Sequence, residues 1–144
     1  MRRLLIGLAF ATVGVTIAAC SSGGSGSAGG TGGTLDGTAW TPMFQFDGNF
    51  DSVAFLRGSV NYVAHHLRPN GRVLIIGTGG GRDLLAARAF GQPRVLGIEL
   101  NPLMRYITED VYPDYSGRPY TQIGAEVIID EARSRLPYLG ERFD

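Results

Sequence analysis

Cysteine is almost absent from the sequence: Cys20 is the only one in 144 residues, which excludes an internal disulfide. Neither charge sign is in excess, because 13 Lys and Arg residues balance 13 Asp and Glu residues. Nucleic-acid-binding proteins usually carry a basic surplus, so we expect no nucleic acid among the partners. Histidine is limited to His65 and His66, whose side chains point about 100° apart on a helix. We therefore predict that both lie at the surface or near the helix end, with no metal site.

A buried strand, a glycine turn, a helix and a second strand are predicted between Arg72 and Glu99. The turn consists of Gly77, Thr78, Gly79, Gly80 and Gly81. Glycines permit a tight turn and let the backbone lie against a ligand, where a Cβ would collide. An acid about 20 residues further on, here Glu99, can accept hydrogen bonds from both ribose hydroxyls. This pattern is typical of the first half of a nucleoside-binding βαβ unit.

The glycine spacing favours a ligand without phosphate. A dinucleotide fingerprint has its third glycine one residue later, where this chain has Arg82. We therefore favour S-adenosylmethionine or a relative over a nicotinamide dinucleotide, and a ligand-free turn least of all, because glycines are so frequent here. Asp83 has two interpretations: it contacts the ligand, or it is simply an acid stabilised by the helix N-terminus.

Downstream, Asn101 and Pro102 predict a helix start that runs to about Asp110. Prolines and a glycine in residues 111–120 predict a tyrosine-rich loop, either packed on the surface or lying over a ligand. Residues 125–129 predict a third strand, followed by Asp130 and Glu131. Ligands of open α/β sheets bind beyond the carboxyl ends of strands, so Glu99 and Glu131 are expected to flank one crevice. Alternatively, Glu131 stabilises a helix N-terminus.

Upstream, apolar residues recur three and four apart across residues 53–67, which predicts one amphipathic packing helix. Its apolar face would contain Val53, Leu56, Val60, Val63 and Leu67. Residues 40–50 contain alternating aromatics and an Asp47-Gly48 pair, which favours a hairpin turned at that pair.

Four segments, residues 73–85, 95–102, 127–136 and 143–144, resemble the spermidine synthase-like branch of the class I S-adenosylmethionine-dependent methyltransferase superfamily. The resemblance implies an α/β, Rossmann-like class I methyltransferase fold and a donor that is S-adenosylmethionine or decarboxylated S-adenosylmethionine. It further implies that Glu99 holds the ribose and that Glu131, with Asp130, holds the adenine amino group. Aminopropyltransferases carry a donor-contacting Asp where this chain has Gly80, so we expect little aminopropyl transfer.

The resemblance implies that only the N-terminal half of this fold is present. The full sheet has more strands than the three predicted here, and residues 143–144 correspond to the start of the fourth. We therefore expect a truncated sheet with one uncovered edge, and we assign no catalytic residue, because the base is expected after Asp144. The predicted domains are a signal peptide (1–20), a Gly/Ser-rich tether (21–36), a lead-in segment with the packing helix (37–71) and an incomplete nucleoside-binding domain (72–144).

The N-terminus has the features of a secretory signal peptide: Arg2 and Arg3, a short apolar run and small residues before Cys20. The run is shorter than the roughly 20 apolar residues of a membrane span. Cys20 stands where bacterial lipoproteins carry their lipidated cysteine, so we predict lipidation at Cys20 and an extracytoplasmic chain anchored to the membrane. The alternative is an uncleaved anchor helix. With a lipid on Cys20, the Gly/Ser tract would be a flexible tether between the lipid and the domain.

These two predictions conflict, since S-adenosylmethionine is a cytosolic metabolite and a lipoprotein faces away from the cytosol. The domain binds something else outside, or it uses an exported donor, or translation starts downstream at Met43 and the chain is cytoplasmic. The leading function is a methyl- or aminopropyl-transferase with an unknown acceptor and an open oligomeric state. The alternatives are an NAD(P)-dependent oxidoreductase and a non-catalytic lipoprotein binding module.

Overall fold

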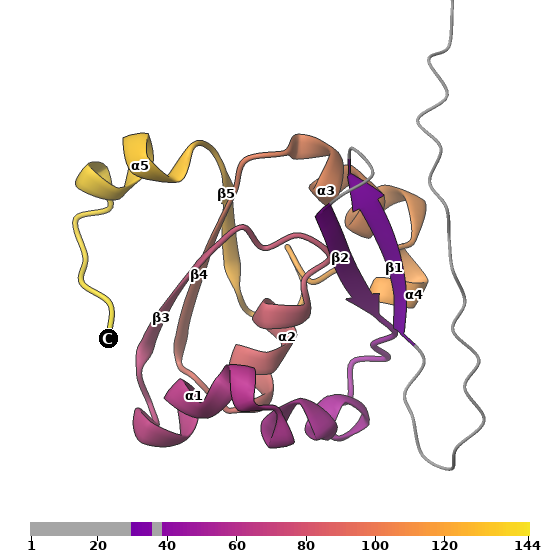
Figure 1. Cartoon of the computed structure of the whole chain (residues 1–144), viewed down its shortest axis with the longest axis horizontal. Coiled ribbons are helices and arrows are strands. Elements are labelled where there is room, and N and C mark those ends of the chain that lie inside the picture. The colour runs from indigo at the N-terminus through magenta and orange to yellow at the C-terminus, as the bar shows by residue number, and fades with distance from the viewer. Residues whose placement is uncertain (1–29, 36–38) are drawn as a thin grey trace, which may run out of the picture.

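The computed structural model describes residues 30–35 and 39–144, which form an α/β structure (Figure 1). An antiparallel hairpin pairs β1 (Gly30–Leu35) with β2 (Ala39–Phe44). A parallel sheet has the order β3 (Arg72–Ile76), β4 (Arg94–Glu99), β5 (Glu126–Ile129). The α-helices are α1 (Val63–Leu67), α2 (Arg82–Ala89), α3 (Pro102–Tyr106), α4 (Pro113–Ser116) and α5 (Ala132–Arg135). Short 3₁₀ helices span Phe50–Gly58, Val60–Tyr62 and Leu136–Tyr138, and a π-helical turn spans Ile107–Val111.

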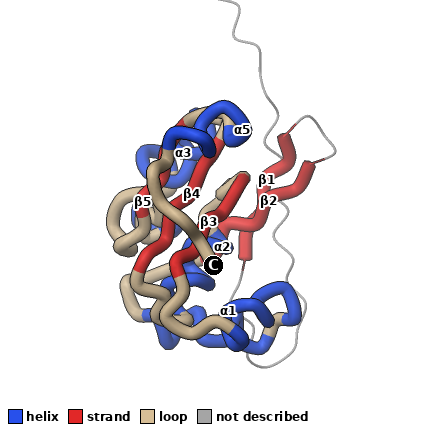
Figure 2. The backbone as a smooth tube through the Cα atoms, turned by 90° about the vertical axis from the view of Figure 1, so that its left-hand side faces the viewer, coloured by secondary structure: helices blue, strands red, loops and turns tan. Residues whose placement is uncertain are grey.

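The sheet has one continuous hydrophobic core. β4 is paired on both edges, and all its residues after Arg94 are buried. α2 packs on one face of the sheet, where Leu84 and Leu85 are almost inaccessible. Val53 and Leu56, from the 3₁₀ helix Phe50–Gly58, join the same core. Figure 1 shows α2 between the sheet and the hairpin, and in Figure 2 the hairpin lies to the right of β3, β4 and β5.

The three strands confirm the predictions from hydrophobic pattern, and the helix start after β4 confirms the prediction from Asn101 and Pro102. The expected burial of the first strand is wrong, because β3 lies at the edge of the three-stranded sheet and is only partly buried, with Ile76 60% exposed. The strands are parallel, as a βαβ unit requires. The Asn101 side chain accepts a hydrogen bond from the Leu103 amide at 2.9 Å, and Pro102 is the first residue of α3. The helix widens into the π-helical turn before it ends at Val111, close to the expected end at Asp110.

The predicted single helix over residues 53–67 is wrong. Ser59 has extended backbone angles (φ −81°, ψ 133°) and accepts a hydrogen bond from the Asn61 amide, so it ends one helix and caps the next. The helical phase is lost there. Val53 and Leu56 are buried, but three residues of the expected apolar face are exposed: Val60 by 81%, Val63 by 52% and Leu67 by 74%.

The predicted hairpin at Asp47-Gly48 is also wrong. Asp47 accepts a hydrogen bond from the Asn49 amide at 2.9 Å, and Asn49 in turn caps the 3₁₀ helix by accepting from the Asp51 amide. The observed hairpin lies earlier in the chain, with Leu35 opposite Ala39. Its first strand falls within the residues that we assigned to the tether.

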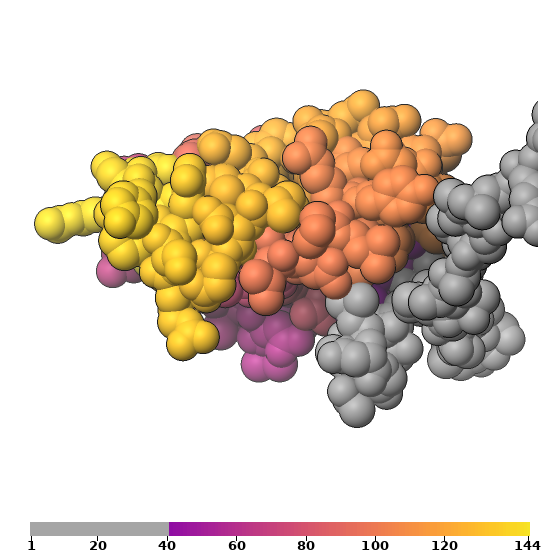
Figure 3. Space-filling model, turned by 90° about the horizontal axis from the view of Figure 1, so that it is seen from above, coloured from indigo at the N-terminus to yellow at the C-terminus, as the bar shows by residue number. Residues whose placement is uncertain are grey.

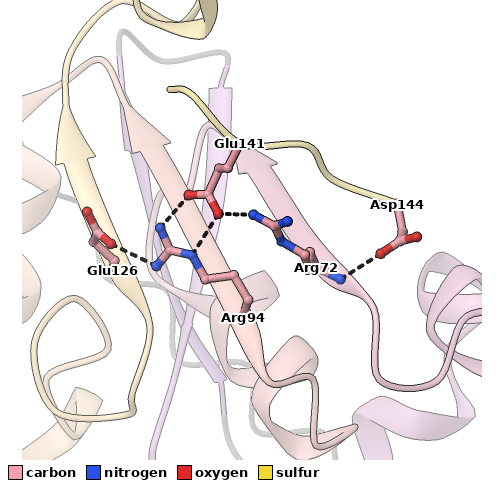
Figure 4. Close-up of polar contacts among 5 residues, drawn as sticks. All are labelled: Arg72, Arg94, Glu126, Glu141 and Asp144. Atoms are coloured by element: carbon pink, nitrogen blue, oxygen red, sulfur yellow. Dashed lines mark hydrogen bonds and ion pairs between the residues drawn. The ribbon is translucent and has the colours of Figure 1, made fainter. Parts of the chain in front are cut away.

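The C-terminal segment returns to the amino-terminal ends of the strands (Figure 4). Glu141 forms ion pairs with Arg72 of β3 at 2.5 Å and with Arg94 of β4 at 2.6 Å, and Arg94 also pairs with Glu126 of β5. The Asp144 amide donates to the Arg72 carbonyl oxygen at 3.0 Å, and the Arg72 amide donates to the Asp144 carboxylate. The segment therefore ties three strands together and lies beside the free edge of β3.

Candidate functional site

The candidate site lies where β3 and β4 end, at the loop of residues 77–81 between β3 and α2. Glu99, the last residue of β4, is only 7% exposed. One of its carboxylate oxygens accepts a hydrogen bond from the Gly79 amide at 2.8 Å, and the other accepts from the Asn101 amide at 2.9 Å. The acid and the glycine loop, 20 residues apart in sequence, therefore lie in contact, as the motif spacing predicts. Figure 3 shows from above the segments that follow β4 (orange) and β5 (yellow) side by side at this end of the sheet.

The backbone of the loop is held by protein groups on several sides. The Gly80 amide donates to the Thr41 hydroxyl of β2 at 2.8 Å, and the Gly81 amide donates to the Thr78 carbonyl oxygen at 2.9 Å. On the opposite side, the Tyr120 hydroxyl lies 2.6 Å from the Gly79 carbonyl oxygen. The amides of residues 79–81 are thus all used within the protein, counting the Gly79 bond to Glu99.

Packing within the chain explains why three of these residues are glycines. A Cβ at Gly79 would lie 2.2 Å from the Thr41 hydroxyl oxygen. At Gly80 it would lie 2.3 Å from the Pro42 carbonyl oxygen, and at Gly81 it would lie 2.5 Å from Cγ of Pro119. We expected the abundance of glycine to indicate a ligand. It follows instead from the close approach of β2 and Pro119, so it does not by itself argue for a ligand.

Gly77 differs from the other loop glycines. It is exposed, has a positive φ of 78°, and a Cβ there would meet no atom within 4 Å. Its amide donates to the Ile98 carbonyl oxygen of β4 at 2.8 Å. Gly77 is therefore the loop glycine whose backbone, at the carboxyl end of β3, is accessible to an outside molecule.

Asp83 is engaged in the first turn of α2. Its carboxylate accepts hydrogen bonds from the Tyr62 hydroxyl at 2.6 Å and from the Arg82 guanidinium at 3.0 Å. Burial raises the pKa of Tyr62, and the hydrogen bond to the Asp83 carboxylate raises it further. These residues line a cavity of about 360 Å³ along the edge of β3, which His65 also lines. The structure therefore gives Asp83 protein partners and does not join it to Glu99.

Of the two acids after β5, Asp130 lies beside Glu99, and Glu131 caps a helix. The Asp130 amide donates to the Glu99 carbonyl oxygen at 2.9 Å. The Glu131 carboxylate accepts from the Arg133 and Ser134 amides at the start of α5. Those backbone bonds hold the pKa of Glu131 below its ordinary value. The structure thus supports the helix-cap interpretation of Glu131 and places Asp130 next to Glu99, where β4 and β5 end.

The sequence reasoning missed Thr41, Tyr120 and Glu109. Glu109 is 7% exposed and accepts hydrogen bonds from the Tyr120 amide at 2.8 Å and from the Thr121 hydroxyl at 2.5 Å. Tyr120, 4% exposed, is the last residue of the tyrosine-rich loop, and it packs beneath the glycine loop. The prolines and glycine predicted that residues 111–120 form a loop, but Pro113 begins the short helix α4 within it. No local pattern indicates which of its tyrosines is buried.

The two histidines pack against the end of α2. The His65 and His66 rings lie 5.0 and 4.7 Å from the Phe90 ring. Partial burial lowers the pKa of His65. Within residues 30–35 and 39–144, no group of three or more His, Cys, Asp or Glu side chains is arranged to hold a metal ion.

In comparisons with known proteins, no family model and no curated protein matches the chain. Cys20 and the predicted signal peptide lie outside the described residues. In the part of the chain that the structure describes, no helix has the length and hydrophobicity needed to cross a membrane.

Proposed function

We propose that the crevice at the carboxyl ends of β3 and β4 binds the adenosyl group of S-adenosylmethionine or decarboxylated S-adenosylmethionine. The observation that carries this proposal is the buried Glu99 carboxylate in contact with the glycine loop. A carboxylate offers about four lone-pair positions, of which the Gly79 and Asn101 amides use two. Glu99 therefore retains acceptor capacity for the two hydroxyls of a ribose that approaches over Gly77.

The loop is better suited to a sulfonium nucleoside than to a nicotinamide dinucleotide. A pyrophosphate needs free amide donors at the loop, and the amides of residues 79–81 already donate to Glu99, Thr41 and Thr78. The negative charge of Glu99 also disfavours a phosphate beside Gly79. A sulfonium is positively charged, so the acids Glu99 and Asp130 at the strand ends attract it.

The strand order and the hairpin support the finer fold assignment that we propose, the N-terminal half of a spermidine synthase-like class I methyltransferase fold. The first strand of the unit is β3, β4 and β5 follow on one side, and Asp144 lies at its other edge. The resembled family has an N-terminal β segment over the donor site, and here β2 lies against the loop at Gly80.

The proposed chemistry is group transfer from the sulfonium. An amine or hydroxyl nucleophile attacks the carbon next to sulfur in line, the carbon–sulfur bond breaks, and a thioether leaves while a base accepts the nucleophile's proton. The described residues would position the donor, and we assign none of them as that base. A binding module that lacks turnover remains the alternative, and a transfer assay separates it from a transferase.

For location, we propose a membrane-anchored lipoprotein with lipid on Cys20. One structural feature argues against a start at Met43. A chain beginning there would lack β1 and also Thr41, whose hydroxyl accepts the Gly80 amide. The glycine loop would then lose its contact with β2, so the hairpin favours a start upstream of Met43.

Titration calorimetry on Glu99→Gln tests the proposed site. The variant replaces one carboxylate oxygen with an amide group that faces an amide donor, so we expect S-adenosylmethionine to bind about 10- to 100-fold more weakly, the equivalent of roughly 1–3 kcal/mol. Glu126→Gln is the matched control, because it makes the same change at the amino-terminal end of the neighbouring strand. Circular dichroism confirms folding. Unchanged affinity in Glu99→Gln, or no binding by the wild type, would overturn the proposal.

A further inference from the structure

We infer that Tyr120 is a positioning residue for this site, whose hydroxyl fixes the orientation of the Gly79–Gly80 peptide in the glycine loop. The relevance of this orientation to a ligand rests on the proposed function. The geometry of the contact does not depend on the proposed function, because every atom involved belongs to the described part of the chain.

The direction of the hydrogen bonds around Tyr120 follows from their chemistry. The Gly79 carbonyl oxygen can only accept, so the Tyr120 hydroxyl donates to it across 2.6 Å. The Tyr120 oxygen then accepts from the Thr78 hydroxyl at 2.8 Å. The Thr78 side chain, 4% exposed, lies 3.5 Å from Glu99, too far for a strong second bond. A single chain of donors therefore runs from Thr78 through Tyr120 to Gly79.

The same peptide is held at its other end by a different element. Its N–H, that of Gly80, donates to the Thr41 hydroxyl of β2 at 2.8 Å. The peptide is therefore clamped between a strand that precedes the loop by about 40 residues and a segment that follows it by about 40. A glycine peptide has no Cβ to restrict its rotation, so these two bonds set its orientation.

The surroundings of Tyr120 hold its ring in place. Glu109 accepts the Tyr120 amide, and Pro119 packs under Gly81. The ring is 4% exposed, and burial together with the nearby carboxylates of Glu99 and Glu109 raises the pKa of Tyr120. A tyrosine hydroxyl is protonated at neutral pH even without this shift, so it is available to donate to the Gly79 carbonyl oxygen.

Loss of this hydroxyl leaves the partly buried Gly79 carbonyl oxygen without its donor. The Gly79–Gly80 peptide can then rotate, and the Gly80 amide opens from Thr41 more often. Glu99 is affected as well, because the Gly79 amide, one peptide away, donates to it. A nucleoside held by Glu99 would meet a loop that must first be ordered, so its affinity falls.

Amide hydrogen exchange measured by NMR on Tyr120→Phe tests the inference directly. We expect the Gly79 and Gly80 amides to exchange at least tenfold faster than in the wild type, beyond any change in global stability. Tyr62→Phe is the matched control, because it also removes a buried tyrosine hydroxyl, 2.6 Å from Asp83, without touching this peptide. Exchange at Gly79 and Gly80 that changes no more in Tyr120→Phe than in Tyr62→Phe would overturn the inference.

Calorimetry with S-adenosylmethionine separates this inference from the proposed function. We expect Tyr120→Phe to bind about tenfold more weakly than the wild type and than Tyr138→Phe, which alters a side chain that is 81% exposed. If the wild type does not bind while exchange rises in Tyr120→Phe, the proposed function fails and the positioning role stands. Equal binding by wild type and Tyr120→Phe would contradict the role of this hydroxyl in the site.

Discussion

Replacing Gly80 with alanine tests whether β2 lies against the glycine loop. The added Cβ would come within 2.3 Å of the Pro42 carbonyl oxygen, 2.8 Å of the Pro42 carbonyl carbon and 3.1 Å of Cα of Met43. All three are backbone atoms, so no side-chain rotation relieves the collision and the strand itself must move. Overpacking of this kind costs about 1–3 kcal/mol. At about 4 °C per kcal/mol, the melting temperature of Gly80→Ala falls by about 4–12 °C.

Thermal unfolding followed by circular dichroism measures this loss, and NMR shifts of residues 41–44 report displacement of β2. Two glycines provide matched controls. Gly58→Ala meets no atom within 4 Å and is expected to change stability by less than about 0.5 kcal/mol. Gly77→Ala is also free of contacts but has a positive φ, so it costs about 1–2 kcal/mol without moving β2. A Gly80→Ala variant as stable as Gly58→Ala would refute the packing of β2 on the loop.

Three further predictions concern the C-terminal segment, the N-terminus and the chemistry. Hydrogen bonds from Arg94 and Arg72 lower the pKa of Glu141 from 4.5 to about 2, so its stabilising effect is complete above pH 4.5 and is lost as the pH falls toward 2. Carbon-detected NMR titration should show this, and a Glu141 pKa near 4.5 would contradict it. Cys20→Ser should block processing and leave the longer precursor, whereas an unmodified wild-type chain beginning at Met1 in intact-mass analysis would rule out lipidation. We expect little or no spermidine from putrescine, because Gly80 stands where the resembled aminopropyltransferases carry a donor-contacting acid, and a side chain there would meet Pro42. Robust aminopropyl transfer would show that another residue does the work of that acid.

The local sequence pattern was sufficient to predict the sheet and to identify Glu99 as the residue that contacts the glycine loop. An apolar run followed by glycines predicts a strand and a turn, although it did not reveal that β3 is an edge strand and only partly buried. An Asn-Pro pair fixes a helix start through capping and ring geometry. The spacing from the loop to Glu99 is set by one helix and one strand of ordinary length. Their contact was therefore predictable from the sequence, and the structure gives it as a 2.8 Å hydrogen bond.

The sequence pattern gave the wrong secondary structure where a hydrogen bond to one polar side chain determined the backbone conformation. The apolar spacing across residues 53–67 is helical throughout, but Ser59 caps a new helix and breaks the phase. Asp47 likewise accepts the Asn49 amide and leads into a helix instead of a hairpin turn. The roles of Thr41 and Tyr120 depend on contacts about 40 residues away in sequence, which no local signal encodes.

We propose that the site at Gly77 and Glu99 binds an adenosyl sulfonium that carries no phosphate. Calorimetric titration of the purified chain with S-adenosylmethionine, decarboxylated S-adenosylmethionine and NAD compares these ligands. Because the amides of residues 79–81 are already used by the protein, we predict that at least one of the two sulfonium ligands binds more than about tenfold tighter than NAD, a difference of roughly 1.4 kcal/mol. Tighter binding of NAD, or no binding of either sulfonium ligand, would contradict the claim.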